Sequence, residues 1–303
     1  MKNFINLADI DKKELRKIID HAKLQKEKKA NINNDAPLKG KTLIMIFEKP
    51  STRTRLSFEL AMKKLGGDVL VLNPQESHYG SGDESIHDTA KILSQYGDVV
   101  MMRTSKHEHF LKFSKHLDIP IINGLTNLSH PVQIMATVMT YEELKGSIAN
   151  KKIAWLGDGN NIVYSLIEAA AQFDFQLAIA CPKKLEPNKK IVKWAKDKKA
   201  NILITKDPKE AAEDASAVIT DKFISMGDNV NKKKKKKLLK PYQVNKKIMK
   251  LAPEAIFMHC LPANRNKEVT DSVMDGKQSA VWLEALNRMY VQKSIIQFCL
   301  NLL

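Results

Sequence analysis

Hydrophobic and polar positions along the chain follow two alternating patterns. Short continuous apolar runs are typical of strands buried on both faces, and apolar residues recurring every three or four positions are typical of amphipathic helices. The runs predict strands at residues 42–47, 68–72, 98–102, 119–122, 152–156, 176–180, 201–205, 217–220 and 255–259. Between and around them, helices are predicted at residues 12–28, 53–65, 85–96, 106–116, 130–145, 160–173, 187–198, 208–213, 244–251 and 283–303.

This alternation predicts an α/β fold with two doubly wound parallel-sheet domains joined by long helices. A chain of 303 residues is long enough for two such domains. The helix at 130–145 separates the first series of strands from the second. We therefore expect one domain at residues 1–134 together with the C-terminal helix 285–303, and the other at residues 135–284.

Composition narrows the class of protein. Hydrophobic residues make up 43% of the chain, yet no apolar run approaches the roughly 20 residues that span a bilayer. The N-terminus lacks the layout of a secretory signal. Cys181, Cys260 and Cys299 suit neither a disulfide framework nor a zinc cluster. The sequence thus predicts a cytoplasmic protein with reduced thiols, no metal and no membrane partner.

The net charge of +16 raises the question of nucleic-acid binding. Lysines occur in tracts, the longest at residues 232–237. Few tracts contain the interleaved aromatic residues that stack on single strands, and no zinc-finger, homeodomain or RNP-like pattern is present. We therefore expect no nucleic-acid partner, and we interpret residues 232–237 as a solvated loop and helix start.

Polar clusters follow the predicted strands. In open parallel sheets, ligands bind beyond the carboxyl ends of the strands. Five clusters occupy such positions, at residues 103–104, 123–133, 157–161, 221–227 and 259–262. Five coincidences together indicate binding surfaces rather than ordinary loops.

A sixth cluster lies at residues 51–55, where the first strand leads into a helix. Ser51 or Thr52 would be the N-cap, and first-turn N–H groups, the helix dipole and Arg53 would all face an anion. This favours a site for phosphate or carboxylate. The alternative is an ordinary capped helix with solvated arginines.

The glycine-rich turn at residues 157–161 invites comparison with dinucleotide-binding proteins. Gly157 and Gly159 match the first two glycines of that fingerprint, but Ile162 stands where the third should be. No acidic residue follows the next strand to bind a ribose hydroxyl. An NAD-dependent dehydrogenase remains the alternative function, while Asn160 and Asn161 suit the backbone end of an amino acid.

Taken together, the motifs resemble the aspartate/ornithine carbamoyltransferase family over essentially the whole chain. They are Ser-Thr-Arg-Thr-Arg at 51–55, His-Pro-Val-Gln at 130–133, Asp221 with Ser-Met-Gly at 225–227, and His-Cys-Leu-Pro at 259–262. The last two are similar to those of the ornithine-specific branch. The resemblance implies transfer of a carbamoyl group from carbamoyl phosphate to the δ-amine of L-ornithine, giving L-citrulline and phosphate, without a cofactor.

The resemblance also implies which residues bind each substrate. The first domain would bind carbamoyl phosphate, and Arg103, His130 and Thr54 would stabilise the oxyanion. The carbamoyl phosphate residues would be Ser51, Thr52, Arg53, Thr54, His78, Arg103, His130, Gln133, Cys260, Leu261 and Arg288. His78 matches a residue that the family borrows from a neighbouring subunit, which implies a homotrimer with shared active sites.

The second domain would bind ornithine. Asn161 would take the carboxylate end, while Asp221, Ser225 and the backbone of Met226 would take the α-ammonium. Cys260 is the family's candidate for accepting the amine proton, through a thiolate in an electropositive pocket. Arg103, His130 and Cys260 are thus the predicted catalytic residues, and arginine biosynthesis is the expected role rather than breakdown of citrulline.

Three positions depart from the family pattern. Thr137 replaces an aspartate, Phe223 a tryptophan or tyrosine, and Leu286 interrupts the usual Glu-Ala-Glu-Asn-Arg ending. None removes a substrate-contacting position. A carbamoyltransferase acting on a related amine is a further alternative, since substrates such as acetylated ornithine are close in chemistry.

Overall fold

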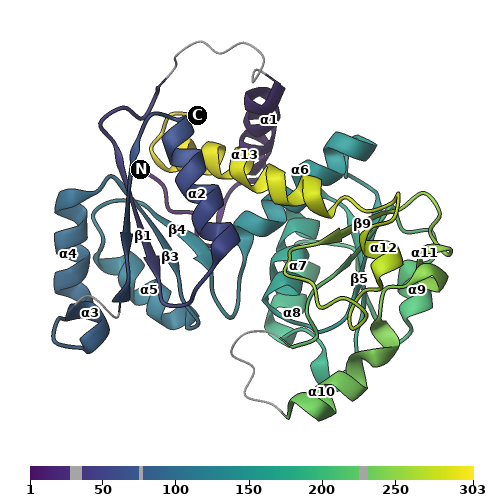
Figure 1. Cartoon of the computed structure of the whole chain (residues 1–303). Coiled ribbons are helices and arrows are strands. Elements are labelled where there is room, and N and C mark those ends of the chain that lie inside the picture. The colour runs from purple at the N-terminus through teal and green to yellow at the C-terminus, as the bar shows by residue number, and fades with distance from the viewer. Residues whose placement is uncertain (28–35, 75–77, 225–230) are drawn as a thin grey trace. The chain divides into compact units, whose positions relative to one another are not determined.

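The computed structural model describes residues 1–27, 36–74, 78–224 and 231–303 (Figure 1). The chain forms two compact units, Met1–Met135 with Leu286–Leu303, and Ala136–Ala285. Both boundaries fall inside helices, one in α6 (Pro131–Lys145) and one in α13 (Val281–Cys299). The C-terminal part of α13 therefore belongs to the same unit as the N-terminal residues.

Unit 1 contains a parallel sheet of four strands in the order β2-β1-β3-β4. The strands are β1 (Thr42–Phe47), β2 (Asp68–Leu72), β3 (Val99–Arg103) and β4 (Ile121–Leu125). The helices up to α6 are α1 (Lys12–Glu27), α2 (Thr52–Lys64), α3 (His78–Ser81), α4 (Ile86–Tyr96) and α5 (His107–His116). Helical turns and strands thus alternate as the hydrophobic pattern predicts.

Burial in unit 1 follows the sequence pattern. β3 is buried at all five positions, as expected for a central strand covered on both faces. The predicted apolar face of α1 is also buried and consists of Leu15, Ile18, Ile19 and Ala22. The His21 Nδ1 atom on α1 lies 3.2 Å from the Ser294 Oγ atom on α13, so the N- and C-terminal helices share part of this core.

Unit 2 contains a parallel sheet of five strands in the order β7-β6-β5-β8-β9. The strands are β5 (Lys152–Leu156), β6 (Gln176–Ala180), β7 (Ile202–Thr205), β8 (Ala217–Thr220) and β9 (Ile256–His259). The helices are α7 (Asn161–Phe173), α8 (Lys189–Asp197), α9 (Pro208–Ala212), α10 (Lys232–Leu239), α11 (Lys246–Met249) and α12 (Asp271–Met274). The predicted α/β fold with two parallel sheets is confirmed.

Two local predictions were wrong. Asn123 and Gly124 were expected in a loop, but β4 continues through them to Leu125. Residues 232–237 were expected as a solvated loop and helix start; a helix does begin at Lys232 and five of these lysines are exposed, but no loop is present within this range and Lys235 is buried. In both cases the reason is a contact with residues far away in the sequence, as described below.

No helix within the described ranges combines the length and the apolar character needed to cross a bilayer.

Candidate functional site

In unit 1, the turn after β1 leads directly into α2. Ser51 has the extended backbone of an N-cap residue, with φ −155° and ψ 98°, but its side chain makes no capping hydrogen bond. The N-cap position is therefore as predicted, while the hydroxyl does not serve as the cap. The first-turn N–H groups lie at the positive end of the helix, which favours an anion.

Thr54 lies at the centre of the predicted phosphate-binding residues. Its hydroxyl oxygen accepts hydrogen bonds from Arg103 Nη1 at 3.1 Å and from Arg288 Nη2 at 2.9 Å. Arg288 Nη1 also donates to Gln133 Oε1 at 2.9 Å. All four side chains are buried. Residues from α2, β3, α6 and α13 thus form one connected group, although they are far apart in the sequence.

His130 lies in the positive field of this group. Its pKa is held well below the usual value of 6.5, first by burial and then by the charges of Arg288, Arg103 and Arg53. Near pH 7 the imidazole is therefore neutral, and one ring nitrogen carries a proton that can be donated in a hydrogen bond. Three guanidinium groups around a neutral imidazole make this part of unit 1 strongly attractive to an anion.

Thr52 and His78 lie at the periphery of unit 1. The side chain of Thr52 is exposed on the first turn of α2. His78 begins α3 and helps to line an apolar cavity of about 320 Å³ beside β1, β2 and α4. The next residue, Tyr79, donates to Glu48 Oε1 at 2.8 Å, so α3 is fastened to the segment that carries the turn after β1.

In unit 2, Asn160 and Asp221 connect two strand ends. Asn160 caps α7 by accepting hydrogen bonds from the N–H groups of Ile162 at 3.0 Å and Val163 at 3.3 Å. Its amide nitrogen donates to Asp221 Oδ2 at 3.0 Å. The other Asp221 oxygen accepts from Cys260 Sγ at 3.2 Å. The ends of β5, β8 and β9 therefore meet at one carboxylate.

The sequence predicts an electropositive pocket around Cys260, but the structure places the Asp221 carboxylate beside its sulfur atom. One neighbour of the sulfur is a carboxylate, and the thiol donates to it. A thiolate at this position would be repelled by the Asp221 charge. The electropositive surroundings expected for Cys260 therefore include one negative neighbour, the Asp221 carboxylate.

The chain around Cys260 is held by buried hydrogen bonds. Leu261 adopts a left-handed backbone with φ 60°, and its N–H donates to His259 Nδ1 at 2.8 Å. The His259 N–H donates to Glu284 Oε2 at 3.1 Å, and Thr137 Oγ1 donates to Glu284 Oε1 at 2.5 Å. The threonine that departs from the family pattern thus helps to fix the end of β9. A non-glycine residue with positive φ is typical of functional sites.

Several predicted positions in unit 2 need separate mention. Asn161 is the first residue of α7 and is half-buried. Phe223 is buried in the hydrophobic core of unit 2, which accounts for an aromatic side chain without a polar atom. Ser225 and Met226 lie outside the described residues. The bridging role of Asn160 was missed, because sequence alone signals only its capping position.

Asp221, His259 and Cys260 offer one oxygen, one nitrogen and one sulfur atom that lie within 4.8 Å of one another. Such a set suits a transition metal in principle. Two of these groups are joined by a hydrogen bond, and His259 Nδ1 already accepts from the Leu261 N–H. Hydrogen bonds within the protein thus engage Asp221, Cys260 and the Nδ1 atom of His259.

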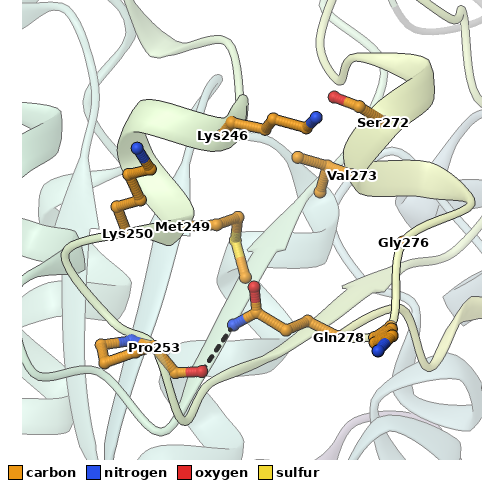
Figure 2. Close-up of a pocket in the computed structure, with 9 residues that line it drawn as sticks. Lys246, Met249, Lys250, Pro253, Ser272, Val273, Gly276 and Gln278 are labelled. Atoms are coloured by element: carbon orange, nitrogen blue, oxygen red, sulfur yellow. Dashed lines mark hydrogen bonds between the residues drawn. The ribbon is translucent and has the colours of Figure 1, made fainter.

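A cavity of about 300 Å³ lies elsewhere in unit 2 (Figure 2). Its walls are formed by Met249, Pro253, Val273, Gly276 and Gln278, and by the side chains of Lys246, Lys250, Ser272 and Lys277. Figure 2 shows the Gln278 amide donating to the Pro253 carbonyl, a bond of 3.0 Å. None of the predicted site residues lines this cavity, so it is not part of the candidate site.

Comparison with known proteins gives a consistent result. The model for the aspartate/ornithine carbamoyltransferase carbamoyl-P binding domain matches residues 2–143, and the model for the Asp/Orn binding domain matches residues 149–299. A curated ornithine carbamoyltransferase from Brucella suis biovar 1 is 48% identical over 302 residues, covering 99% of this chain and 96% of the relative.

Solved structures agree with the sequence relatives. Ornithine carbamoyltransferase from Pyrococcus furiosus has a TM-score of 0.93 and 40% identity, covering 98% of this chain and 96% of that one. Anabolic ornithine carbamoyltransferase from Campylobacter jejuni has a TM-score of 0.91 and 36% identity, covering 99% of each chain. Because both family models and full-length relatives match, the chain belongs to the aspartate/ornithine carbamoyltransferase family.

Proposed function

We propose that this chain is an ornithine carbamoyltransferase that transfers the carbamoyl group of carbamoyl phosphate to the δ-amine of L-ornithine, giving L-citrulline and phosphate. The observation that carries the proposal is the group formed by Thr54, Arg103 and Arg288 beside a neutral His130. The names of the full-length relatives support the same reaction.

The phosphate of the first substrate is assigned to the start of α2. Ser51, Thr52, Arg53 and Thr54 would surround it with hydroxyl, amide and guanidinium donors, which suit a dianion. The Ser51 hydroxyl makes no capping hydrogen bond with the N–H groups of α2. This supports the role, because no such hydrogen bond has to be broken before the hydroxyl donates to phosphate.

The carbonyl oxygen of carbamoyl phosphate becomes negatively charged when the amine attacks. Arg103, His130 and Thr54 are assigned to stabilise it, with Arg103 bridging the oxygen and the phosphate. A neutral imidazole donates a hydrogen bond to this charge without giving up its proton, and a donor aimed at a developing oxyanion contributes about 3 to 4 kcal/mol. The depressed pKa of His130 supports a neutral donor rather than an imidazolium acid.

The amide edge of the carbamoyl group needs acceptors as well as donors. Gln133 Oε1 and the backbone carbonyl of Leu261 are acceptors of this kind, and Arg288 orients Gln133 through its hydrogen bond of 2.9 Å. Cys260 completes this set. The left-handed backbone of Leu261 supports its assignment. Such a conformation is costly for a residue other than glycine, and it is found where function requires a particular orientation of the backbone, here of the Leu261 carbonyl.

Ornithine is assigned to unit 2. Asn161 would hold its carboxylate end at the start of α7, and Asp221, Ser225 and the backbone of Met226 would hold its α-ammonium. Asp221 supports this role because its two hydrogen bonds come from neutral groups, the Asn160 amide and the Cys260 thiol. Its negative charge therefore remains for an ammonium group.

The δ-amine must lose a proton before it can attack. Its solution pKa is near 10.4, so the neutral form at pH 7 costs about 4 to 5 kcal/mol. Cys260 is the proposed proton acceptor in its thiolate form, after its own thiol proton has been released to solvent, and binding of ornithine would favour this ionisation. When the α-ammonium pairs with Asp221, the repulsion between this carboxylate and a Cys260 thiolate becomes weaker. Alignment of two bound substrates contributes roughly 7 to 11 kcal/mol, so no covalent intermediate is required.

We further propose a cytoplasmic homotrimer that serves arginine biosynthesis. β2 is an edge strand with exposed Leu70 and Val71, and α4 carries exposed Ile92 and Tyr96. Exposed apolar residues beside a sheet edge suit burial against another copy. His78 would enter the neighbouring copy's phosphate site. The biosynthetic direction is supported by the Campylobacter jejuni relative, which is described as anabolic.

An assay of citrulline formation tests the proposal. Carbamoyl phosphate is supplied with ornithine, aspartate, putrescine or acetylornithine in separate reactions, and product and phosphate are both measured. Ornithine alone should give stoichiometric product and phosphate. If another of these amines is carbamoylated instead, that amine is the substrate. If none of the four is carbamoylated and the protein reduces a nicotinamide cofactor, the dehydrogenase alternative is favoured.

A further inference from the structure

One lysine of the long basic tract differs from its neighbours. In α10, Lys235 is only 6% exposed, whereas Lys232, Lys233, Lys234, Lys236 and Lys237 are all exposed. The Lys235 Nζ atom lies 2.5 Å from Asp158 Oδ2, and both side chains are almost completely excluded from solvent. The tract therefore contains one buried ion pair within a solvated face.

Asp158 lies in a closely packed turn between β5 and α7. Its carbonyl oxygen accepts a hydrogen bond of 3.1 Å from Trp155 Nε1, and the next residue, Gly159, donates to the Leu185 carbonyl at 2.9 Å. A Cβ atom on Gly159 would come within 2.3 Å of that same carbonyl oxygen. The Asp158 carboxylate is thus attached to backbone that has little freedom to move away.

The same turn leads into the residues assigned to ornithine. Asn160 follows two positions after Asp158, caps α7 and donates to Asp221. The charge of Asp158 also acts on α7. The pKa of Tyr164 is raised first by burial and then by the negative charge of Asp158. An uncompensated carboxylate here would oppose the positive helix end and repel a bound carboxylate.

We propose that Lys235 is a positioning residue for ornithine binding, and that it acts by compensating the charge of Asp158 at the head of α7. This inference rests on the proposed function, since Asn161 at that helix start is assigned to the ornithine carboxylate. Lys235 would also hold α10 against the turn. Removal of one partner of a buried pair leaves an uncompensated charge, whereas replacement of both partners by neutral groups is often tolerated.

The experiment compares five variants in the full-length protein. Lys235→Met removes the compensating charge, Lys235→Arg keeps it, and Lys235→Met with Asp158→Asn removes both charges. Asp158→Asn alone leaves the lysine, and Lys236→Met is the matched control on the exposed face of the same helix. For each variant, the KM values for ornithine and for carbamoyl phosphate are measured with kcat, together with thermal stabilisation by ornithine.

Lys235→Met should raise the KM for ornithine by about tenfold or more, which corresponds to about 1.4 kcal/mol. The KM for carbamoyl phosphate should change less than about twofold, since its assigned residues other than Cys260 and Leu261 lie in unit 1. Lys235→Arg and the double variant should recover most of the ornithine affinity, and Lys236→Met should behave as wild type. Thermal stabilisation by ornithine should follow the same order.

Three results would overturn the inference. They are a Lys235→Met enzyme that matches Lys236→Met, equal losses for both substrates, and a double variant no better than Lys235→Met. If Lys235→Met does not fold, the variant with both substitutions tests the inference instead. The inference requires that this double variant folds and keeps most of the wild-type affinity for ornithine. Absence of citrulline formation by wild type would instead contradict the proposed function, so the two failures are distinguishable.

Discussion

The hydroxyl of Thr54 is the most direct point at which to test the carbamoyl phosphate site. It accepts from two guanidinium groups, those of Arg103 and Arg288, and its side chain is completely buried. Thr54→Val keeps the branched shape of the side chain and removes only the oxygen. The variant therefore removes this one acceptor, keeps the shape of the side chain, and takes the shared acceptor away from two buried guanidinium donors.

The expected loss follows from the two hydrogen bonds. A hydrogen bond to a charged group contributes about 1.5 to 3 kcal/mol, and a buried donor that loses its acceptor costs about 1 to 3 kcal/mol. The two bonds share one acceptor and are not additive, so we expect a total loss of about 3 kcal/mol in transition-state stabilisation. This corresponds to roughly a hundredfold decrease in kcat/KM for carbamoyl phosphate.

The assay measures citrulline formation at saturating ornithine over a range of carbamoyl phosphate concentrations. Ser57→Ala is the matched control, since the Ser57 hydroxyl lies one turn later on α2 and donates to the Thr54 carbonyl at 3.3 Å. Thermal unfolding verifies that both variants are folded at the assay temperature. A folded Thr54→Val enzyme within about threefold of wild type in kcat/KM would refute the assignment of this hydroxyl.

Four further predictions concern other parts of the site. Arg53→Ala should weaken carbamoyl phosphate binding by at least about tenfold in titrations, since a charged donor to phosphate is lost; unchanged affinity would contradict the phosphate assignment. Burial and three arginines lower the pKa of His130 in the folded protein. Below about pH 6.5 the unfolded chain therefore binds more protons than the folded protein, and the free energy of unfolding falls by up to about 1.4 kcal/mol per pH unit. Between pH 6.5 and 5, the free energy of unfolding should fall more for wild type than for His130→Gln. Cys260→Ser should lower kcat by about tenfold or more, with a smaller change in the KM for ornithine, because a serine hydroxyl is a weaker proton acceptor; unchanged kcat would exclude Cys260 as the acceptor. Prolonged treatment with a chelator should leave turnover unchanged, since the proposed steps use only protein side chains, and loss restored by added metal would identify a metal requirement.

The strands were predictable because their signal is local. Continuous apolar runs such as residues 42–47 and 152–156 correspond closely to β1 and β5, since a strand in a parallel sheet must be apolar on both faces. β4 was predicted too short for a reason that lies elsewhere in the chain. The Asn123 N–H donates to the Phe4 carbonyl at 2.8 Å, and a Cβ on Gly124 would lie 2.5 Å from the Met101 sulfur. Distant contacts of this kind leave no local pattern.

The helix at residues 232–239 illustrates a second limit. Consecutive lysines repel one another at helical spacing, so the local sequence argues against a helix. Asn231 caps the helix by accepting from the Lys234 N–H at 3.1 Å, and Lys235 pairs with Asp158. The capping residue is readable from the sequence, whereas the partner of Lys235 lies far earlier in the chain. Tertiary contacts therefore decide the conformation of this segment.

The candidate site was predictable to a different degree in each unit. In unit 1, Thr54, Arg103, Gln133 and Arg288 were named from the family resemblance, and they form one hydrogen-bonded group. In unit 2, Asp221 was named, and Asn160 was suggested for the backbone end of an amino acid, but its hydrogen bond to Asp221 was not foreseen. Hydrogen bonds between side chains at different strand ends depend on the order of the strands in the sheet. The sequence does not give this order; it indicates only that ligands bind beyond the carboxyl ends of parallel strands.

The two units distribute charge in different ways, and this difference is itself evidence about their ligands. Unit 1 gathers the charges of Arg53, Arg103 and Arg288 around His130, whose pKa is lowered first by burial and then by these charges. Unit 2 pairs the Asp158 carboxylate with a lysine, whereas the Asp221 carboxylate is bound by neutral donors. A dianion is favoured by the first arrangement and a single ammonium group by the second. The charges thus suit the proposed assignment of the phosphate to unit 1 and of the α-ammonium to unit 2.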